Sequence, residues 1–406
     1  MRKYTKLTPE GVRDVLFEEC RARGRARERL TEIFTRRGYQ EVMTPGLEYF
    51  DVFNLPGAAI PQQEMYKSTD HAGRLLVFRP DSTLPIARMA AARLQNHRRP
   101  MRLYYCQNVY RSCPALSGKS HELAQMGVEL LGASGLRADL EVIGTAVEAL
   151  EAVAPDFRIE LGHAGVFQRL AGRLEVSPER REEIRATIEA KNYGALDSLL
   201  DPLGGSPQAE AIRRLPRMFG GEEALAQAER CDLDGDAAQT LAYLRRLYTA
   251  LKELGLGGRL MVDLGLVQRN DYYTGVVFSG YVQEQGGPVL TGGRYDGLCG
   301  QLGAPMPAAG FALDLDAAAR LGTGLGEAPP AAVLVHGEAG YEAQAQRELA
   351  RLAGEGVRAE ASVWESLEEA LAYAREAGIE KVLCAGETVR ELTGKEADLC
   401  GRCALP

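Results

Sequence analysis

The side chains that could bind and act on a small polar ligand fall into a few short segments of this chain. They include carboxyl, amide, hydroxyl, guanidinium and phenol groups, carried by Asp81, Thr83, Arg111, Gln125, Glu129, Tyr272, Tyr273 and Tyr295. Carboxylate and amide oxygens accept hydrogen bonds from an ammonium group, and a carboxyl group or a phenol can pair with a ring nitrogen. Each residue alone has a plainer explanation, because Asp81 follows a proline and suits a turn, and a tyrosine can be a core residue with a satisfied hydroxyl.

Four segments containing these residues occur in an order that resembles the class II histidyl-tRNA synthetases. The first two are residues 38–45 followed by Glu48, and residues 78–83 followed by Arg88. The others are residues 109–111 with 125–129, and residues 271–275 with 292–298. In that family they form the first class II motif at the dimer interface, the histidine-contacting loop, the second class II motif and two histidine-specific signatures. The resemblance covers roughly residues 1–320.

The resemblance implies a pocket for histidine, formed by the eight residues above. Glu129 and Tyr273 match the family positions that contact the two imidazole nitrogens. Asp81, Thr83 and Gln125 match the positions around the α-amino group. Asp81 departs from the family's usual glutamate, and its carboxylate is set back by about 1.5 Å, the length of one C–C bond. A lower affinity for histidine is expected from that change.

The residues that would stabilise phosphate are missing. Activation of an amino acid by ATP concentrates negative charge on phosphate oxygens, and arginine suits this task because its planar fork stays charged. Arg111 of the second motif is present, but the acid expected two positions later is Cys113, and His121 stands where an arginine is expected. The arginine of the first histidine signature is Gln268, and the one that ends the third class II motif is Ala317.

These losses predict a protein without catalytic residues of its own. One missing transition-state donor costs on the order of 100- to 1,000-fold in rate, and Asp316 adds a carboxylate where phosphates would lie. We therefore expect no adenylation, and we expect neither a metal nor a cofactor. Of the eight cysteines, only Cys400 and Cys403 have C-x-x-C spacing, and without a second ligand pair they are expected to be reduced thiols.

Hydrophobic periodicity predicts the elements that position these residues. A helix is expected over residues 15–37, with Asp14 as its N-cap and Gly38 after its end. Strand patterns recur along the chain, and an apolar helix is expected over residues 138–154. Together with the resemblance they indicate an α+β fold, a class II synthetase-like antiparallel sheet flanked by helices, over residues 1–173 and 255–320. The charged helical pattern of residues 174–254 predicts a helical insertion.

The C-terminal part has a different character. A Gly- and Pro-rich stretch predicts a linker over residues 321–331, and the β-α-β-α-β pattern of residues 332–406 predicts a small α/β domain. Its position resembles that of a diverged anticodon-binding domain. From Ala331 onward, however, 14 acidic residues face 8 basic ones, and the whole chain carries a net charge of −8. A nucleic-acid-binding module normally has the opposite bias, so we expect no nucleic-acid partner.

The chain has no run of about 18 apolar residues and no apolar stretch typical of a signal peptide, so a cytoplasmic protein without a membrane partner is expected.

A retained histidine pocket combined with lost ATP chemistry is typical of the ATP phosphoribosyltransferase regulatory subunits, paralogues of histidyl-tRNA synthetase in histidine biosynthesis. The resemblance implies a hetero-oligomer with a short-form catalytic subunit, a homodimer through the first-motif surface, and L-histidine as effector. Members often lack an anticodon-like domain, so residues 332–406 are a departure. Two alternatives remain, a stand-alone histidine or RNA sensor and an atypical active histidyl-tRNA synthetase.

Overall fold

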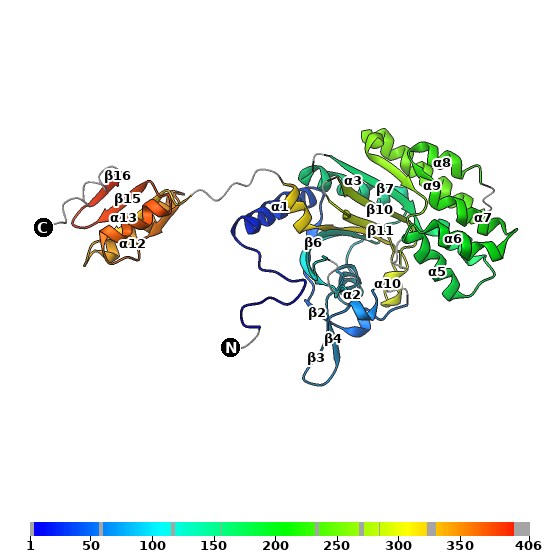
Figure 1. Cartoon of the computed structure of the whole chain (residues 1–406), viewed down its shortest axis with the longest axis horizontal. Coiled ribbons are helices and arrows are strands. Elements are labelled where there is room, and N and C mark those ends of the chain that lie inside the picture. The colour runs from blue at the N-terminus through cyan, green and yellow to red at the C-terminus, as the bar shows by residue number, and fades with distance from the viewer. Residues whose placement is uncertain are drawn as a thin grey trace. The chain divides into compact units, whose positions relative to one another are not determined.

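The computed structural model describes residues 4–56, 60–114, 118–154, 156–231, 235–267, 272–283, 285–322 and 330–393. The chain divides into two compact units, Met1–Gly324 and Leu325–Pro406 (Figure 1). None of the helices in the described ranges is both long and apolar enough to span a bilayer.

The first unit is built on a nine-stranded sheet of order β1-β5-β6-β12-β11-β10-β7-β9-β8. The strands are β1 Gln40–Glu41, β5 Met101–Tyr110, β6 Glu122–Leu131, β7 Phe157–His163, β8 Phe219–Gly220, β9 Leu260–Asp263, β10 Val276–Val282, β11 Pro288–Arg294 and β12 Ala308–Asp314. All neighbours from β5 to β7 are antiparallel, as expected. The pairs β1–β5 and β7–β9 are parallel, so the sheet as a whole is mixed.

Alternation along β6 separates the two faces of this sheet. Met126, Val128 and Leu130 are buried in one hydrophobic core, and Leu131 belongs to the core on the other face. Because successive side chains of a strand point to opposite faces, Glu129 projects to the same side as Leu131. That side carries the candidate site.

Helices α1 Phe17–Arg36, α3 Leu136–Val153 and α11 Leu315–Leu321 contact one another against the first face. Phe34 of α1 is fully buried, with its ring 5.9 Å from that of Phe311 in β12. The predicted N-cap was wrong: Leu16 precedes the helix and makes no side-chain cap, because the chain enters α1 in an extended conformation beyond Asp14. Gly38 follows the helix at a φ of 81°, a left-handed value that glycine accepts without strain.

The second face is covered by α2 Thr83–Arg93 and α10 Leu298–Gln301, which contact each other. A small antiparallel sheet precedes α2, with order β2-β4-β3 and strands β2 Leu47–Tyr49, β3 Lys67–Thr69 and β4 Leu75–Phe78. Arg79 joins this sheet to the main one, because its buried guanidinium donates to the carbonyls of Thr44, Pro45 and Asn108 at 2.7–3.0 Å.

Six helices fill the region between β7 and β9: α4 Ala164–Gly172, α5 Pro178–Glu189, α6 Tyr193–Leu200, α7 Pro207–Arg214, α8 Glu222–Ala228 and α9 Gly235–Leu251. Serine caps with proline in the first turn begin α5 and α7. The apolar residues of these helices belong to the same core as the main sheet, and α9 packs on α3. Strand β8 of this region pairs with β9.

The second unit is a four-stranded sheet with two helices. Its elements are β13 Val333–Gly337, α12 Glu342–Gly354, β14 Ala359–Ala361, α13 Leu367–Glu376, β15 Lys381–Ala385 and β16 Val389–Thr393. The sheet order is β14-β13-β15-β16, with β13 parallel to both β14 and β15. The antiparallel strand β16 was not predicted from the sequence. Cys400 and Cys403 lie outside the described residues.

Candidate functional site

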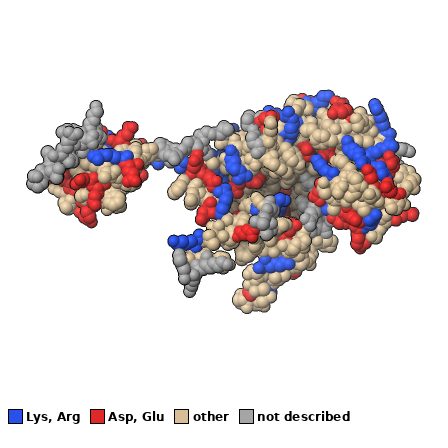
Figure 2. Space-filling view, viewed as in Figure 1, with Lys and Arg blue, Asp and Glu red and all other residues tan. Residues whose placement is uncertain are grey.

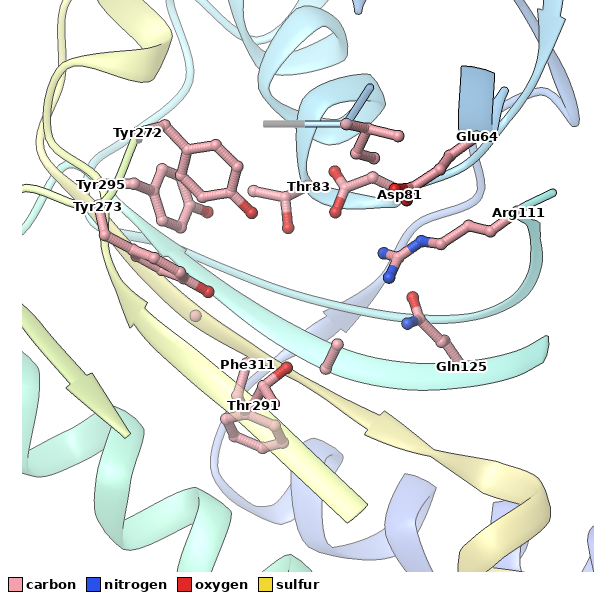
Figure 3. Close-up of a pocket in the computed structure, with 13 residues that line it drawn as sticks. Glu64, Asp81, Thr83, Arg111, Gln125, Tyr272, Tyr273, Thr291, Tyr295 and Phe311 are labelled. Atoms are coloured by element: carbon pink, nitrogen blue, oxygen red, sulfur yellow. The ribbon is translucent and has the colours of Figure 1, made fainter. Parts of the chain in front are cut away.

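A cavity of about 260 Å³ opens on the site face of the main sheet (Figure 3). Seven of the eight predicted residues line it: Asp81, Thr83, Arg111, Gln125, Tyr272, Tyr273 and Tyr295. The eighth, Glu129, is 1% exposed and is hydrogen-bonded to two of them. Segments separated by more than two hundred residues are thus brought together around one small space.

Glu129 on β6 is the buried acid of this site. Its Oε1 accepts a hydrogen bond from the Thr83 hydroxyl at 2.8 Å, and its Oε2 accepts one from the Tyr295 hydroxyl. Burial raises the pKa of Glu129 to about 8; the two hydrogen bonds oppose this rise, and the nearby carboxyl group of Asp81 adds to it. The carboxyl group therefore holds its proton at neutral pH and can give it up to a basic ligand.

Glycines opposite the site residues make room for them. In β12, a Cβ at Gly310 would lie 1.9 Å from Oε2 of Glu129, and in β11 a Cβ at Gly293 would lie 2.6 Å from the Tyr273 ring. Both glycines stand within the motifs that carry the resemblance, but neither was singled out as a site residue. They are needed because the strands bring their backbones against side chains that fill the space a Cβ would take.

Three tyrosines form the opposite wall. Tyr272 packs against Tyr273 and Tyr295, with ring centroids 4.9 and 5.8 Å away. Each ring is at most 7% exposed, and burial raises the pKa of Tyr272 and of Tyr295 well above the ordinary value. Figure 3 shows the hydroxyls of Tyr272 and Tyr273 directed into the cavity. The phenols of Tyr272 and Tyr295 therefore stay neutral, and a phenol can donate or accept a hydrogen bond.

Asp81 combines the two roles considered for it. Its Oδ1 accepts the backbone N–H of Leu84 at 2.9 Å in the first turn of α2, and its carboxyl group also lines the cavity. Burial raises the pKa of Asp81, while the hydrogen bond from Leu84 and the charge of Arg111 oppose the rise.

Arg111, Gln125 and Glu64 gather at the end of the cavity away from the tyrosines (Figure 3). Arg111 donates from Nε to the carbonyl of Pro80 at 2.7 Å, which fixes its guanidinium beside the histidine-contacting loop. Glu64 was missed from the sequence. It stands in a short 3-10 helix, Gln62–Glu64, with no motif around it, and the hydrogen bond from Ser112 N–H to its carbonyl (2.8 Å) brings it to the second motif.

A second cavity, of about 1080 Å³, shares Glu64 and Arg111 with the first. It is lined by three of the positions where the resemblance predicts lost ATP-binding residues, Cys113, His121 and Ala317. The fourth, Gln268, lies outside the described residues. Three of the four positions that the resemblance associates with ATP therefore line one cavity.

His121 is engaged within the protein. Its Nε2 accepts the backbone N–H of Cys113 at 3.4 Å, so Nδ1 carries the ring proton and donates to the Tyr66 hydroxyl at 2.6 Å. Its backbone N–H donates to the carbonyl of Gly11 at 2.7 Å, and a Cβ at Gly11 would lie 2.3 Å from the ring. The imidazole thus holds the N-terminal segment Glu10–Arg13, which lines the same cavity.

Ala317 belongs to the start of α11. Its backbone N–H, like that of Asp316, donates to Oδ1 of Asp314 at 2.9 Å. The carboxylate of Asp316 pairs with Arg23 of α1 at 2.5 Å. Asp314 and Asp316 therefore line the larger cavity beside Ala317.

Comparison with known proteins first defines the class. The family model for histidyl-tRNA synthetase matches residues 11–318. A crystal structure titled ATP phosphoribosyltransferase regulatory subunit/histidyl-tRNA synthetase, from Bacillus halodurans, superposes with a TM-score of 0.82 at 29% identity, covering 95% of this chain and 99% of that one. A histidyl-tRNA synthetase from a Nostoc species has a TM-score of 0.73 at 20% identity, covering 98% and 100%, and shares the fold.

Two curated relatives are more specific. The ATP phosphoribosyltransferase regulatory subunit of Clostridium acetobutylicum is 38% identical over 401 residues, which cover 96% of this chain and 98% of that protein. That of Clostridium novyi is 34% identical, covering 94% and 93%. The chain belongs to the family of ATP phosphoribosyltransferase regulatory subunits, within the histidyl-tRNA synthetase-like proteins. Because these alignments extend over the second unit, residues 332–406 are not the departure from the family that was expected.

Proposed function

We propose that this chain is the non-catalytic regulatory subunit of an ATP phosphoribosyltransferase, that it binds L-histidine in the cavity beside Glu129, and that it carries out no adenylation. Its partner is a short-form catalytic subunit, which condenses ATP with phosphoribosyl pyrophosphate in the first step of histidine biosynthesis. Neither a cofactor nor nucleic acid takes part on this chain. The family membership supports the regulatory role. The two cavities support the proposal that the chain binds histidine but does not adenylate it.

The observation that carries the proposal is the contrast between the two cavities. The smaller one has a protonated acid and phenols suited to an imidazole, with acceptors beside them for an ammonium group. In the larger one, His121 is hydrogen-bonded to Tyr66, and Asp314 and Asp316 stand where phosphate would lie. The acids of the larger cavity offset its cations, Arg13, Arg111, Lys119 and Arg320, and its His121 is engaged by Tyr66, so this cavity offers a polyphosphate no excess of positive charge.

Calorimetric titration of L-histidine into the full chain tests the pocket. Glu129→Ala should abolish or strongly weaken binding. Glu160→Gln is the matched control, because Glu160 is a partly buried acid on β7 of the same sheet, away from the cavity. Equal affinity in wild type and Glu129→Ala would remove the pocket from the proposal. Histidine-dependent exchange of pyrophosphate into ATP should stay at background, and measurable exchange would instead identify an active synthetase.

Regulation requires histidine to bind two states of the complex unequally, by about 1–3 kcal/mol for ordinary coupling. The test is reconstitution with a short-form catalytic subunit. Phosphoribosyl-ATP formation should depend on this chain and fall on addition of histidine, and the fall should be lost with Glu129→Ala. If no complex forms while histidine still binds, the chain is a stand-alone sensor.

A homodimer is also proposed, through the sheet β2-β4-β3. Leu47, Tyr49 and Phe78 are each about 40% exposed there. The register pairs Leu47 with Phe78, and Tyr49 is two residues along the same strand, so the three side chains share one face. An exposed apolar face of this kind is typical of a protein interface.

A further inference from the structure

The second unit carries an exposed aromatic and acidic edge. Since β13, β14 and β15 are parallel, their carboxyl ends meet at one edge of the sheet. Val363 is 85% exposed, Trp364 42% and Val389 40%, and these are the exposed large apolar residues among residues 330–393. Val363 and Trp364 come shortly after the carboxyl end of β14, and Val389 begins β16, the strand that follows β15. We call this set of ends, with the loops that follow them, the Trp364 edge.

Charge is distributed unevenly around this unit. Four exposed acids stand at the Trp364 edge. Glu342 and Glu368 lie in the first turns of α12 and α13, and Glu365 and Glu387 lie in the loops after β14 and β15. At the other ends of these elements, the bases Arg358, Arg375 and Lys381 stand among the acids Glu355, Glu376 and Glu380, so charge there is balanced. The only described basic residue at the Trp364 edge is Arg390, and it is paired with Glu338. Figure 2 shows the acidic side chains on the visible face of this unit.

Trp364 is held in place although it is exposed. Its ring lies 6.0 Å from that of Tyr373 in α13, and the Tyr373 hydroxyl donates to Glu360 at 2.8 Å. The backbone N–H of Trp364 donates to the Ser362 hydroxyl at 3.4 Å. Two residues later, Ser366 begins α13 and forms a reciprocal capping box with Glu369. An indole fixed in this way loses little conformational entropy when it meets a partner, which is one reason why tryptophan is frequent in binding hot spots.

We propose that the Trp364 edge binds a lysine- or arginine-rich segment of a partner protein. A cation over an indole face is attracted by the ring, and carboxylates around it add attraction to the same charge. Nucleic acid would be repelled by this edge, although the domain resembles one that binds anticodons in the synthetases. Val363 beside Trp364 would contact the aliphatic stem of one basic side chain, and Val389, at the other end of the sheet edge, that of a second one. This inference does not depend on histidine binding.

The single tryptophan of the chain gives the experiment its readout, because fluorescence excited at wavelengths that the 16 tyrosines do not absorb reports on Trp364 alone. The probe is a blocked octalysine peptide, titrated at low salt, with a blocked octaglutamate peptide as control. Octalysine should produce a saturable change in emission that is lost as salt is raised, since charges at the surface are screened. Anisotropy of a dye-labelled octalysine gives an independent affinity.

Matched charge variants separate this edge from the general acidity of the unit. Glu365→Gln/Glu387→Gln should weaken octalysine binding by about tenfold. Glu376→Gln/Glu380→Gln changes the net charge equally at the opposite edge, and it should leave the affinity within about twofold. Trp364→Ala, followed by anisotropy, should weaken binding by about three- to tenfold. Equal losses in the two double variants, no binding of octalysine, or tighter binding of transfer RNA than of octalysine would each overturn the proposal.

Discussion

The Tyr66 hydroxyl lies 2.6 Å from Nδ1 of His121, a residue that lines the larger cavity. Tyr66 comes from the loop before β3, and His121 from the start of β6. The same histidine holds the carbonyl of Gly11 through its backbone N–H. His121 therefore has a structural role at this position, because its contacts tie three distant segments together.

Tyr66→Phe should lower the free energy of unfolding by about 1–2 kcal/mol, because the buried Nδ1–H of His121 would lose its acceptor. Tyr341→Phe is the control, since no hydrogen bond of the Tyr341 hydroxyl is found within the described residues. Its loss should be within about 0.5 kcal/mol, as for most surface changes. Thermal unfolding of both variants at one protein concentration measures the difference. Equal stability of Tyr66→Phe and wild type would mean that the His121 hydrogen bond contributes nothing.

Glu129→Gln should stabilise the chain, and increasingly so at higher pH. The pKa of about 8 in the folded chain is above the ordinary value of 4.5, so the folded chain keeps a proton that the unfolded chain releases between these pH values. The contribution of Glu129 to stability is therefore full below pH 4.5 and is lost as pH rises through 8. At pH 9 the gain from glutamine should be roughly 2–4 kcal/mol larger than at pH 4.

Thermal unfolding at pH 5, 7 and 9 measures the stability difference between Glu129→Gln and wild type. Glu376→Gln, on the surface of the second unit, is the control. A pH-independent difference between Glu129→Gln and wild type would contradict the raised pKa.

The affinity for histidine should have a maximum between pH values of about 6.5 and 8. In the proposed complex, the imidazole and the Glu129 carboxyl group share one proton. Free histidine holds such a proton below about 6.5, and free Glu129 holds it up to about 8. Binding must release a proton below this window and take one up above it, so the affinity falls by about tenfold per pH unit outside it.

Calorimetry of wild type and Glu129→Gln from pH 6 to 9 measures this effect. The ratio of the two affinities isolates Glu129, because titration of the free ligand affects both proteins equally. The ratio of wild-type to variant affinity should fall above pH 8. A ratio that rises through pH 8 would show that the ionised carboxylate is the binding form.

The sequence predicted those features that motifs and periodicity encode. Glu129 and Tyr273 could be named because they stand in ordered motifs of one family, and the comparisons confirm the family and its fold. Glu64 could not be named, since it stands in no motif and a backbone hydrogen bond from Ser112 helps to bring it to the cavity. The contact between Gly11 and His121 was equally inaccessible, because it joins segments about 110 residues apart without any repeating pattern.

Strand direction at the sheet edges was also beyond the sequence. Strand β1 has two residues, and the pattern of residues 39–44 does not show that they run parallel to β5. Antiparallel β16 follows β15 after a short turn, but its alternation is weak and its residues are exposed at the start. Pairing of such short strands depends on tertiary contacts more than on propensity.

Leu47→Lys/Tyr49→Lys should convert a wild-type dimer into a monomer. Both residues stand on β2, the edge strand of the sheet β2-β4-β3, with their side chains on its exposed face. Lysines at an edge strand are compatible with the folded state but oppose pairing with a second copy, because two charged pairs would be buried against each other. The two substitutions leave the ion pair between Glu48 and Arg88 (2.7 Å) intact, because Glu48 points to the other face of this sheet.

Sedimentation velocity over a range of micromolar concentrations distinguishes the outcomes, and Leu254→Lys provides the control because Leu254 is 64% exposed on the far side of the core, beyond α9. Wild type and Leu254→Lys should sediment as dimers, and the double variant as a monomer with an unchanged circular dichroism spectrum. Histidine binding by that monomer would show that the cavity is complete within one chain, since every residue that lines it belongs to the first unit. A monomeric wild type, or a double variant that remains dimeric, would remove this sheet as the interface.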